Sequence, residues 1–233
     1  MARVAMVSGA GRGLGAAIVD KLLAEGWRVS LGLRDVAQVA RFDAPADRLL
    51  ARHFDATEPA TASAWVDATV DHFGKLDALV NNAGILRMVD FDKGDEGDLD
   101  DLWSVNVKAP FRLIKAALPH LRASGQGRVI NIASTDGKRF RPGTSVGYSM
   151  TKHALLAMTQ AVRHAGWEDG VRATALCPGA IDTELIADIP GVTPKADRLS
   201  PDTVAQIVAF TLALPNQASV PEFIANTRLE TLI

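Results

Sequence analysis

Short apolar runs rich in β-branched residues alternate with longer amphipathic segments along almost the whole chain, which constrains the fold more than any other feature. These runs predict strands at Val4–Ser8, Arg28–Leu33, Leu49–Phe54, Ala78–Asn81, Arg128–Ile132, Val171–Leu176 and Val220–Ile224. Most lack period-two alternation, as expected for parallel strands covered on both faces. Helical periodicity predicts helices at Leu14–Glu25, Ala60–Phe73, Leu99–Leu121, Tyr148–Trp167 and Pro201–Leu214. The sequence therefore predicts an α/β fold, a doubly wound parallel sheet of about seven strands with helices on both faces.

No low-complexity segment or linker divides the chain. Its 233 residues are 48% hydrophobic and 22% charged, as in ordinary globular proteins. We therefore expect one domain over residues 1–233. Two stretches, Asp90–Asp98 and Ile189–Ser200, are predicted to be loops, and loops of this length are often lids or binding loops.

The charge balance and the cysteine content exclude several classes of function. With 25 basic and 27 acidic residues the net charge is −2, which leaves no overall field to attract nucleic acid or an anionic membrane. Cys177 is the only cysteine, and the five histidines show no pair at metal-ligand spacing, so we predict no disulfide and no metal site. The N-terminal segment lacks the apolar core of a signal peptide, and no stretch approaches the ~20 apolar residues of a membrane span. We expect a soluble cytoplasmic protein.

The first predicted strand runs directly into the glycine-rich turn Ser8–Gly15, of sequence SGAGRGLG, and then into a helix. Glycines at such a turn let the backbone approach a pyrophosphate, and the helix N-terminus offers unpaired N–H groups. A tight turn that is merely rich in glycine is the alternative. The position after the first strand, with a second strand following the helix, favours a dinucleotide cofactor.

The spacing of this turn resembles that of the classical short-chain dehydrogenase/reductase (SDR) family. The family's other motifs follow in order across essentially the whole chain: Asn81-Asn82-Ala83-Gly84 after the fourth strand, Asn106 in the next helix, Ser134 ending the fifth strand, Tyr148 and Lys152 opening a helix, Pro178-Gly179 after the sixth strand, and then Thr183. The resemblance implies a Rossmann-type fold. It also implies hydride transfer between a nicotinamide cofactor and a carbonyl or secondary alcohol substrate.

The resemblance further implies a set of cofactor contacts spread over these motifs. The set comprises Ser8, Gly9, Arg12, Gly13, Leu14, Gly15, Arg34, Asp55, Asn82, Ala83, Gly84, Tyr148, Lys152, Pro178, Gly179, Ile181 and Thr183. Asp55 resembles the acid that contacts the adenine after the third strand. An aspartate that only forms a turn is the competing interpretation of Asp55.

The end of the second strand indicates which nicotinamide cofactor is bound. An acidic residue there would bind the ribose 2′-hydroxyl of NAD, but the strand alignment places Leu33 at that position. Arg12 and Arg34 suit a 2′-phosphate instead, because a guanidinium can form two parallel hydrogen bonds with it. Two alternatives stay open: both arginines could be solvated surface charges, and Asp35 could pair with Arg34 or reach the ribose. The sequence favours NADP(H) over NAD(H).

Tyr148 and Lys152 are four residues apart, so their side chains lie on one helix face about one turn apart. A free phenol has a pKa near ~10, and a neighbouring ammonium together with an oxidised nicotinamide would lower it. The resemblance implies that Tyr148 protonates the carbonyl oxygen and that Lys152 lowers the pKa of Tyr148 and holds the nicotinamide ribose. It also implies that Ser134 hydrogen-bonds the carbonyl and that Asn106 anchors a water linking Lys152 to solvent. An ordinary Tyr–Lys pair is the alternative, but Tyr148 is the only tyrosine.

The position of the carbonyl-binding hydroxyl is ambiguous by one residue. In many relatives the serine precedes the tyrosine by thirteen positions, which would select Thr135. Alignment on the strand that ends at Ala133 selects Ser134 instead. Because a register slip of one residue turns a side chain to the opposite face, we choose Ser134 and keep Thr135 as the second option.

The leading functional hypothesis is an NADPH-dependent carbonyl reductase, reversibly an alcohol dehydrogenase, that takes a small-molecule substrate. A non-catalytic NADP(H)-binding sensor or scaffold with the same fold is the alternative, although such a protein would not need Ser134, Tyr148 and Lys152 together. The sequence does not identify the substrate. Lys138, Arg139 and Arg141 could favour an anionic substrate, or they could be solvated loop residues.

Two predicted helices carry more apolar residues than one buried face needs. These residues are Ala154, Leu155, Met158, Ala161, Val162 and Ala165 in one helix, and Phe111, Leu113, Ile114, Ala117, Leu118 and Leu121 in the other. Packing onto the sheet alone is the alternative explanation. In proteins similar to this one, the two helices meet their symmetry mates about a two-fold axis. The resemblance therefore implies a homodimer or a homotetramer.

Overall fold

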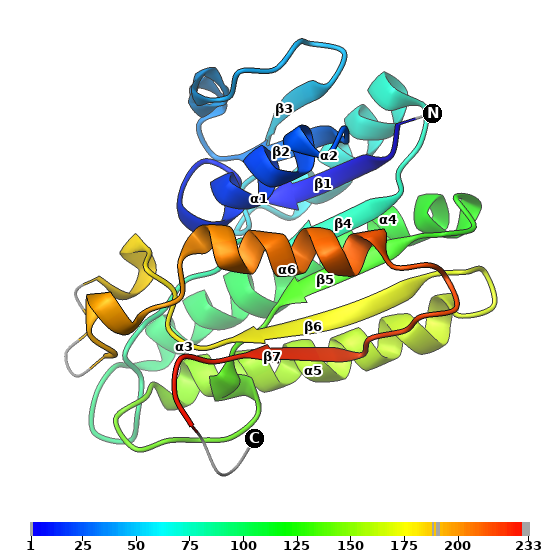
Figure 1. Cartoon of the computed structure of the whole chain (residues 1–233). Coiled ribbons are helices and arrows are strands. Elements are labelled where there is room, and N and C mark those ends of the chain that lie inside the picture. Colours follow the sequence, from blue (N-terminus) through cyan, green and yellow to red (C-terminus); the bar gives the residue numbers. More distant parts are fainter. Residues whose placement is uncertain (1, 188, 190–191, 230–233) are drawn as a thin grey trace.

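The chain folds around a parallel β-sheet, shown in Figure 1 in a computed structural model that describes residues 2–187, 189 and 192–229. In these residues the sheet has seven strands in the order β3-β2-β1-β4-β5-β6-β7, and every neighbouring pair is parallel. The strands are β1 (Val4–Ser8), β2 (Arg28–Leu33), β3 (Leu49–His53), β4 (Ala78–Asn81), β5 (Arg128–Ile132), β6 (Arg172–Pro178) and β7 (Glu222–Ala225). The predicted doubly wound Rossmann-type fold is confirmed.

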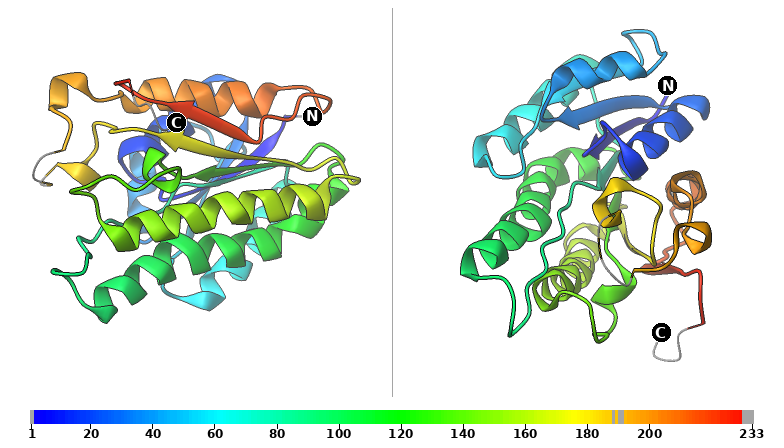
Figure 2. Two further views of the ribbon diagram at one scale, coloured as in Figure 1. Left: turned by 90° about the horizontal axis from the view of Figure 1, so that it is seen from below. Right: turned by 90° about the vertical axis from the view of Figure 1, so that its left-hand side faces the viewer.

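Helices cover both faces of the sheet, as the left view of Figure 2 shows. The long helices are α1 (Gly13–Ala24), α2 (Pro59–Phe73), α3 (Glu96–Trp103), α4 (Ala109–Ala123), α5 (Val146–Gly166) and α6 (Pro201–Ala213). Helices α1 and α6 pack on one face, and α2, α4 and α5 pack on the other. No helix in the described part of the chain is both long and apolar enough to cross a membrane.

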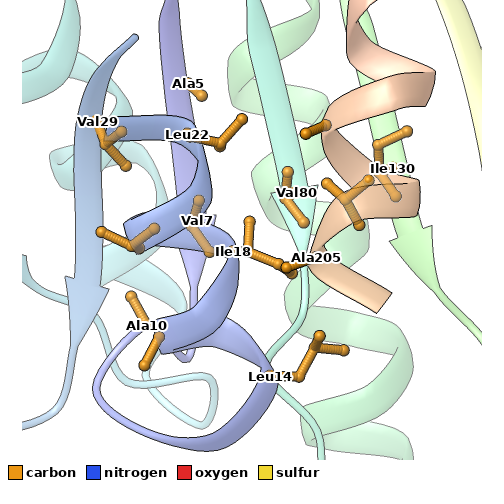
Figure 3. Close-up of a cluster of buried hydrophobic side chains, with 14 of the residues drawn as sticks. Ala5, Val7, Ala10, Leu14, Ile18, Leu22, Val29, Val80, Ile130 and Ala205 are labelled. Atoms are coloured by element: carbon orange, nitrogen blue, oxygen red, sulfur yellow. The ribbon is translucent and has the colours of Figure 1, made fainter. Parts of the chain in front are cut away.

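Burial on two faces explains why the strands read as continuous apolar runs. Along β1, Ala5 and Val7 belong to the apolar cluster beneath α1 and α6, whereas Val4 and Met6 belong to the cluster beneath α2 and α4. Figure 3 shows the first cluster, to which α1 contributes Ile18. Both faces of each central strand thus need apolar residues. Successive side chains point to opposite faces of the sheet, but both sets are apolar.

The predicted helix Leu99–Leu121 is wrong in one respect, because the structure divides it. Helix α3 ends at Trp103, a wider π-helical turn covers Ser104–Lys108, and α4 begins at Ala109. Pro110 supplies the physical reason: proline has no N–H to donate to the carbonyl four residues earlier, which is that of Asn106. Single π turns of this kind occur frequently at functional sites.

Most other element bounds differ from the predicted ones by one or two residues. Several short helical turns were not predicted; one of them covers Val36–Arg41, and Asp35 caps it by accepting a hydrogen bond from Ala37 N. The predicted loop Asp90–Asp98 contains the start of α3. The predicted loop Ile189–Ser200 includes a 3₁₀ turn at Lys195–Asp197, and its residues 190–191 lie outside the described residues.

Candidate active site

The candidate site lies at the carboxyl ends of the strands, where the strand order reverses between β1 and β4. From β1 the chain proceeds outward to β2 and β3, and then returns to β4 on the other side of β1. In open α/β sheets this reversal leaves a crevice beyond the strand ends, where ligands bind. Ser8 ends β1, Asn81 ends β4, and Ile132 and Pro178 end β5 and β6, so the predicted site residues come from this one edge.

Glycine is required at two points of the turn after β1. Gly9 has φ +64°, and a Cβ placed on it would lie 2.9 Å from the Cα of Ala83. A Cβ on Gly15 would overlap the carbonyl oxygen of Gly9. The glycines therefore let the first turn of α1 fold back onto the end of β1.

Ser8 and Asn82 hold this turn against the end of β4. The Ser8 hydroxyl accepts hydrogen bonds from the N–H groups of Asn82 and Ala83, both at 3.0 Å. The Asn82 side-chain amide donates to the carbonyls of Ser8 and Gly9, at 2.9 and 3.1 Å. The side chains of these two predicted cofactor residues are thus engaged within the protein and give the cradle its shape.

The N-terminus of α1 fits a pyrophosphate. Arg12 is the N-cap, but no side chain caps the helix and its first turn contains no acidic residue. The N–H groups of this turn, which includes Gly13, Leu14 and Gly15, are therefore available to an anion at the positive end of a 12-residue helix. A Cβ on Gly13 would lie 3.2 Å from Thr183, so the segment after β6 approaches the same turn. The residues present fit a dinucleotide.

At the ribose end of this cradle, β2 ends in Leu33 rather than in an acidic residue, and Leu33 is only 2% exposed. Asp35 is exposed and caps the turn Val36–Arg41 through Oδ1. Arg12 and Arg34 are exposed as well. The structure adds Arg41, which sequence reasoning missed: its guanidinium donates to the carbonyl of Gly11 at 3.3 Å. Asp35 as a helix cap, followed by a basic residue in the last turn, is the signal that could have revealed it.

Asp55 forms a turn in the structure. Its carboxylate accepts hydrogen bonds from the backbone N–H and the hydroxyl of Thr57, at 2.8 and 2.7 Å. These two bonds lower the pKa of Asp55 below its ordinary value. The turn-forming role is therefore present, and the contact with adenine stays a prediction.

Ser134, Tyr148 and Lys152 come together beside the cradle. Helix α5 begins just before Tyr148, where Ser145 caps it by accepting a hydrogen bond from Tyr148 N at 3.1 Å. The Lys152 ammonium donates to the carbonyl of Ile132 at 2.8 Å and lies 5.4 Å from the centre of the Tyr148 ring. The phenol of Tyr148 interacts with the Ser134 hydroxyl, whereas Thr135 begins the turn η3 (Thr135–Gly137).

Burial dominates the electrostatics of this group. It raises the pKa of Tyr148 well above its ordinary value, Asp136 raises it further, and the hydrogen bond with Ser134 acts in the opposite direction. Burial also lowers the pKa of Lys152 to about 8. The sequence predicts a pKa of Tyr148 lowered by Lys152 and an oxidised nicotinamide. In the chain alone the pKa is raised instead, because desolvation outweighs the lowering by Ser134.

Asn106 connects the π turn to the loop after β4. Its side-chain oxygen accepts from Ile85 N, and its amide donates to Ile85 O and to Thr151 Oγ1, at 2.9, 2.9 and 3.2 Å. A Cβ on Gly84 would lie 3.4 Å from Asn106 Oδ1 and 3.8 Å from Lys152 Nζ, so these groups converge. The water that Asn106 is predicted to hold stays a prediction.

The segment after β6 closes the other side of the site. Gly179 N donates to Ala225 O at 2.8 Å, and Ile181 forms a parallel bridge with Leu199. Together with the approach of Thr183 to Gly13, these contacts carry the chain from the end of β6 back over the glycine turn. The predicted residues Pro178, Gly179, Ile181 and Thr183 are thus brought to the cradle.

Comparison with known proteins identifies the family. The sequence model of the family described as short chain dehydrogenase matches residues 3–191. The chain belongs to this family. It is 40% identical over 220 residues to an agropine synthesis reductase of Rhizobium rhizogenes, a match covering 94% of this chain and 51% of that protein, so the chain spans about half that relative's length.

Solved structures of SDR proteins superpose on nearly the whole chain. An alcohol dehydrogenase from Thermococcus sibiricus, complexed with 5-hydroxy-NADP, has a TM-score of 0.86 at 29% identity and covers 96% of each chain. A 3-ketoacyl-(acyl-carrier-protein) reductase from Brucella melitensis, complexed with NADH, has a TM-score of 0.86 at 28% identity and covers 97% of each chain. Both structures share the fold of this chain, and each holds a nicotinamide dinucleotide. Across residues 2–187, 189 and 192–229, no group of three His, Cys, Asp or Glu could hold a metal ion.

Proposed function

We propose that the chain is an NADPH-dependent reductase of a small carbonyl compound, which can also oxidise the corresponding secondary alcohol. The observation that carries the proposal is the convergence of Ser134, Tyr148 and Lys152 beside a backbone cradle that fits a dinucleotide. The reductases and dehydrogenases among its relatives support the reaction class. A location in the cytoplasm and a single domain remain predictions from the sequence.

The proposed chemistry divides among the three side chains. A nicotinamide cofactor held by this cradle would supply the hydride that the carbonyl carbon gains. Ser134 hydrogen-bonds the carbonyl oxygen, and Tyr148 donates the proton that this oxygen gains. Lys152 binds the nicotinamide ribose, and its ammonium stabilises the phenolate that remains on Tyr148 after proton transfer.

Turnover distinguishes this function from the sensor or scaffold alternative. We expect the purified protein to consume NADPH when it is offered a panel of ketones and aldehydes, followed by absorbance of the reduced cofactor. Binding of NADPH by calorimetry without consumption across a broad panel would favour the sensor. Absence of binding would exclude both hypotheses and leave the cradle unexplained.

The cofactor preference follows from Leu33, Arg12 and Arg34. We expect NADPH to bind at least about tenfold more tightly than NADH, a difference of about 1.4 kcal/mol, because two guanidiniums can bind the 2′-phosphate and β2 ends in Leu33 instead of an acidic residue. Calorimetric titration of both cofactors measures the ratio. Equal affinities, or tighter binding of NADH, would contradict the assignment.

A set of substitutions separates the contributions of the arginines. Replacing Arg34→Asp together with Arg12→Ser should reverse the preference in favour of NADH. Arg41→Ser removes the guanidinium that sequence reasoning missed; it lies beside the carbonyl of Gly11 and 3.7 Å from Asp20. If Arg41 also meets the phosphate, this variant should weaken the binding of NADPH and leave that of NADH unchanged.

We also propose a homodimer formed through α4 and α5. Of the apolar residues predicted for this interface, several are buried within the chain: Leu113, Ile114, Ala117, Leu121, Leu155 and Val162. Phe111 on α4 is 56% exposed, and the small residue Ala157 on α5 is exposed as well. Exposed apolar and small residues on helices are typical of an interface between subunits. We expect light scattering at micromolar concentration to give at least twice the monomer mass of 24.8 kDa. A monomer mass would refute the dimer.

A further inference from the structure

A buried ion pair lies beside the proposed proton donor, in the turn that follows β5. Asp136 Oδ1 and Arg139 Nη1 are 2.7 Å apart, and the two side chains are 17% and 8% exposed. We propose that Asp136 is a positioning residue that keeps Tyr148 in its protonated, proton-donating form, and that Arg139 holds Asp136 and limits its field. The inference deepens the proposed function, on which it rests, because it sets the pH range in which each direction of the reaction proceeds.

The backbone fixes Asp136 next to the catalytic group. Its N–H donates to the Ser134 hydroxyl oxygen at 3.0 Å, so Asp136 is tied to the residue that interacts with Tyr148. The turn also packs directly on α5, since a Cβ placed on Gly137 would lie 2.8 Å from the carbonyl oxygen of Lys152. Asp136 therefore has little freedom to move away from the site.

A carboxylate at this position disfavours a second negative charge nearby. Asp136 accordingly raises the pKa of Tyr148, and its effect is second only to that of burial. Arg139 neutralises part of this field, because its guanidinium pairs with the Asp136 carboxylate at 2.7 Å.

Other titratable and charged groups also face this region, and their effects on Tyr148 must be distinguished from that of Asp136. On α5 the Lys152 ammonium faces the Tyr148 ring. On β6 the buried Cys177 thiol interacts with Lys152, and the salt bridge between Lys138 and Glu222 of β7 lies near Cys177. Helix α3 places the apolar side chains of Leu99 and Leu102 beside Gly147. Lys138 is thus a second cation in the same loop, with its partner on another element.

The ion pair has opposite consequences for the two reaction directions. Reduction needs the proton on Tyr148, which passes from the phenol oxygen to the carbonyl oxygen and is then replaced from solvent. Oxidation needs the phenolate, which takes the proton of the alcohol. By disfavouring the phenolate, Asp136 extends reduction to higher pH and moves oxidation to alkaline pH.

Because Tyr148 is the only tyrosine, its ionisation can be observed directly. Protein labelled with ¹³Cζ-tyrosine gives one tyrosine resonance, which is titrated in the complex with NADP⁺ over the pH range where circular dichroism shows a folded protein. The variant Asp136→Asn removes the charge and keeps the N–H that binds Ser134. We expect its midpoint to fall by about one pH unit relative to the wild type.

Variants of Arg139 complete a double-mutant cycle with Asp136→Asn. Arg139→Met should raise the midpoint by a smaller amount, and the double variant should titrate between Asp136→Asn and the wild type. Arg139→Lys keeps the charge and should keep the midpoint. Lys138→Met is the matched control: it removes a cation that pairs with Glu222, and we expect little change.

The outcomes separate the proposal from its alternatives. An unchanged midpoint in Asp136→Asn, or a shift in Lys138→Met as large as that in Arg139→Met, would overturn it. The pH profile of kcat/KM for alcohol oxidation should move in parallel with the resonance. If the midpoints shift as expected and no substrate is turned over, the electrostatic role stands and the proposed function fails.

Discussion

Replacing Tyr148→Phe is expected to reduce turnover by roughly 10²–10⁴-fold, the usual contribution of a positioned acid or base. The substitution removes one oxygen atom from a buried side chain and leaves its ring in place. The ring packs 5.4 Å from the Lys152 ammonium, and this contact does not need the hydroxyl. Measured rates of NADPH consumption with the best carbonyl substrate give the ratio.

The binding of the cofactor distinguishes a lost proton donor from a damaged fold. The affinity of Tyr148→Phe for NADPH should stay within a few-fold of the wild type, because the glycine turn and the N-terminus of α1 are untouched. Ser134→Ala serves as the matched variant, since it removes the hydroxyl that interacts with Tyr148. Near-normal reduction by Tyr148→Phe would show that another group donates the proton.

The sequence predicts which residues form the cradle and the Ser134, Tyr148 and Lys152 group, because both predictions depend on local order along the chain. The glycines lie in the turn directly after β1. The four-residue step from Tyr148 to Lys152 places these two side chains on one face of a helix. The parallel sheet was predictable for a similar reason, since continuous apolar runs alternate with periodic helices. Local patterns of this kind can be recognised in a sequence without knowing its tertiary contacts.

The features that the sequence did not predict depend on contacts between distant segments. Arg41 reaches Gly11 across thirty residues, and the ion pair of Asp136 with Arg139 acts on Tyr148 only because its turn packs on α5. The π turn at Asn106 was hidden because Pro110 fits the first turn of a helix as well as it breaks one. The pKa of Tyr148 depends on the burial of its phenol, which a helical period does not reveal.

Replacing Lys152→Met is expected to abolish most turnover and yet stabilise the folded protein. Turnover should fall by roughly 10²-fold or more, because the phenolate that forms on Tyr148 loses its neighbouring cation. Affinity for NADPH should fall as well, since Lys152 is proposed to bind the nicotinamide ribose. Turnover and NADPH affinity are measured on the same protein preparation as the free energy of unfolding.

The gain in stability follows from the buried ammonium. Burial lowers the pKa of Lys152 from 10.5 to about 8, so keeping its charge in the fold costs free energy at neutral pH. Methionine is of similar length and carries no charge, so its substitution should raise the free energy of unfolding by about 1–3 kcal/mol, after loss of the hydrogen bond to Ile132. Lys138→Met, which removes a partly exposed lysine, should change stability by less than about 1 kcal/mol.

The advantage of Lys152→Met should depend on pH with a defined sign. Below about pH 8 the wild-type ammonium is charged in both the folded and the unfolded state, and the full cost of burial is present. Between about 8 and 10.5 the folded protein has released this proton while the unfolded chain still binds it, so the wild type gains stability relative to the variant. Urea unfolding at several pH values should show the difference between the two proteins shrinking across this window. A constant difference would mean that the charge of Lys152 is not what limits the stability of the site.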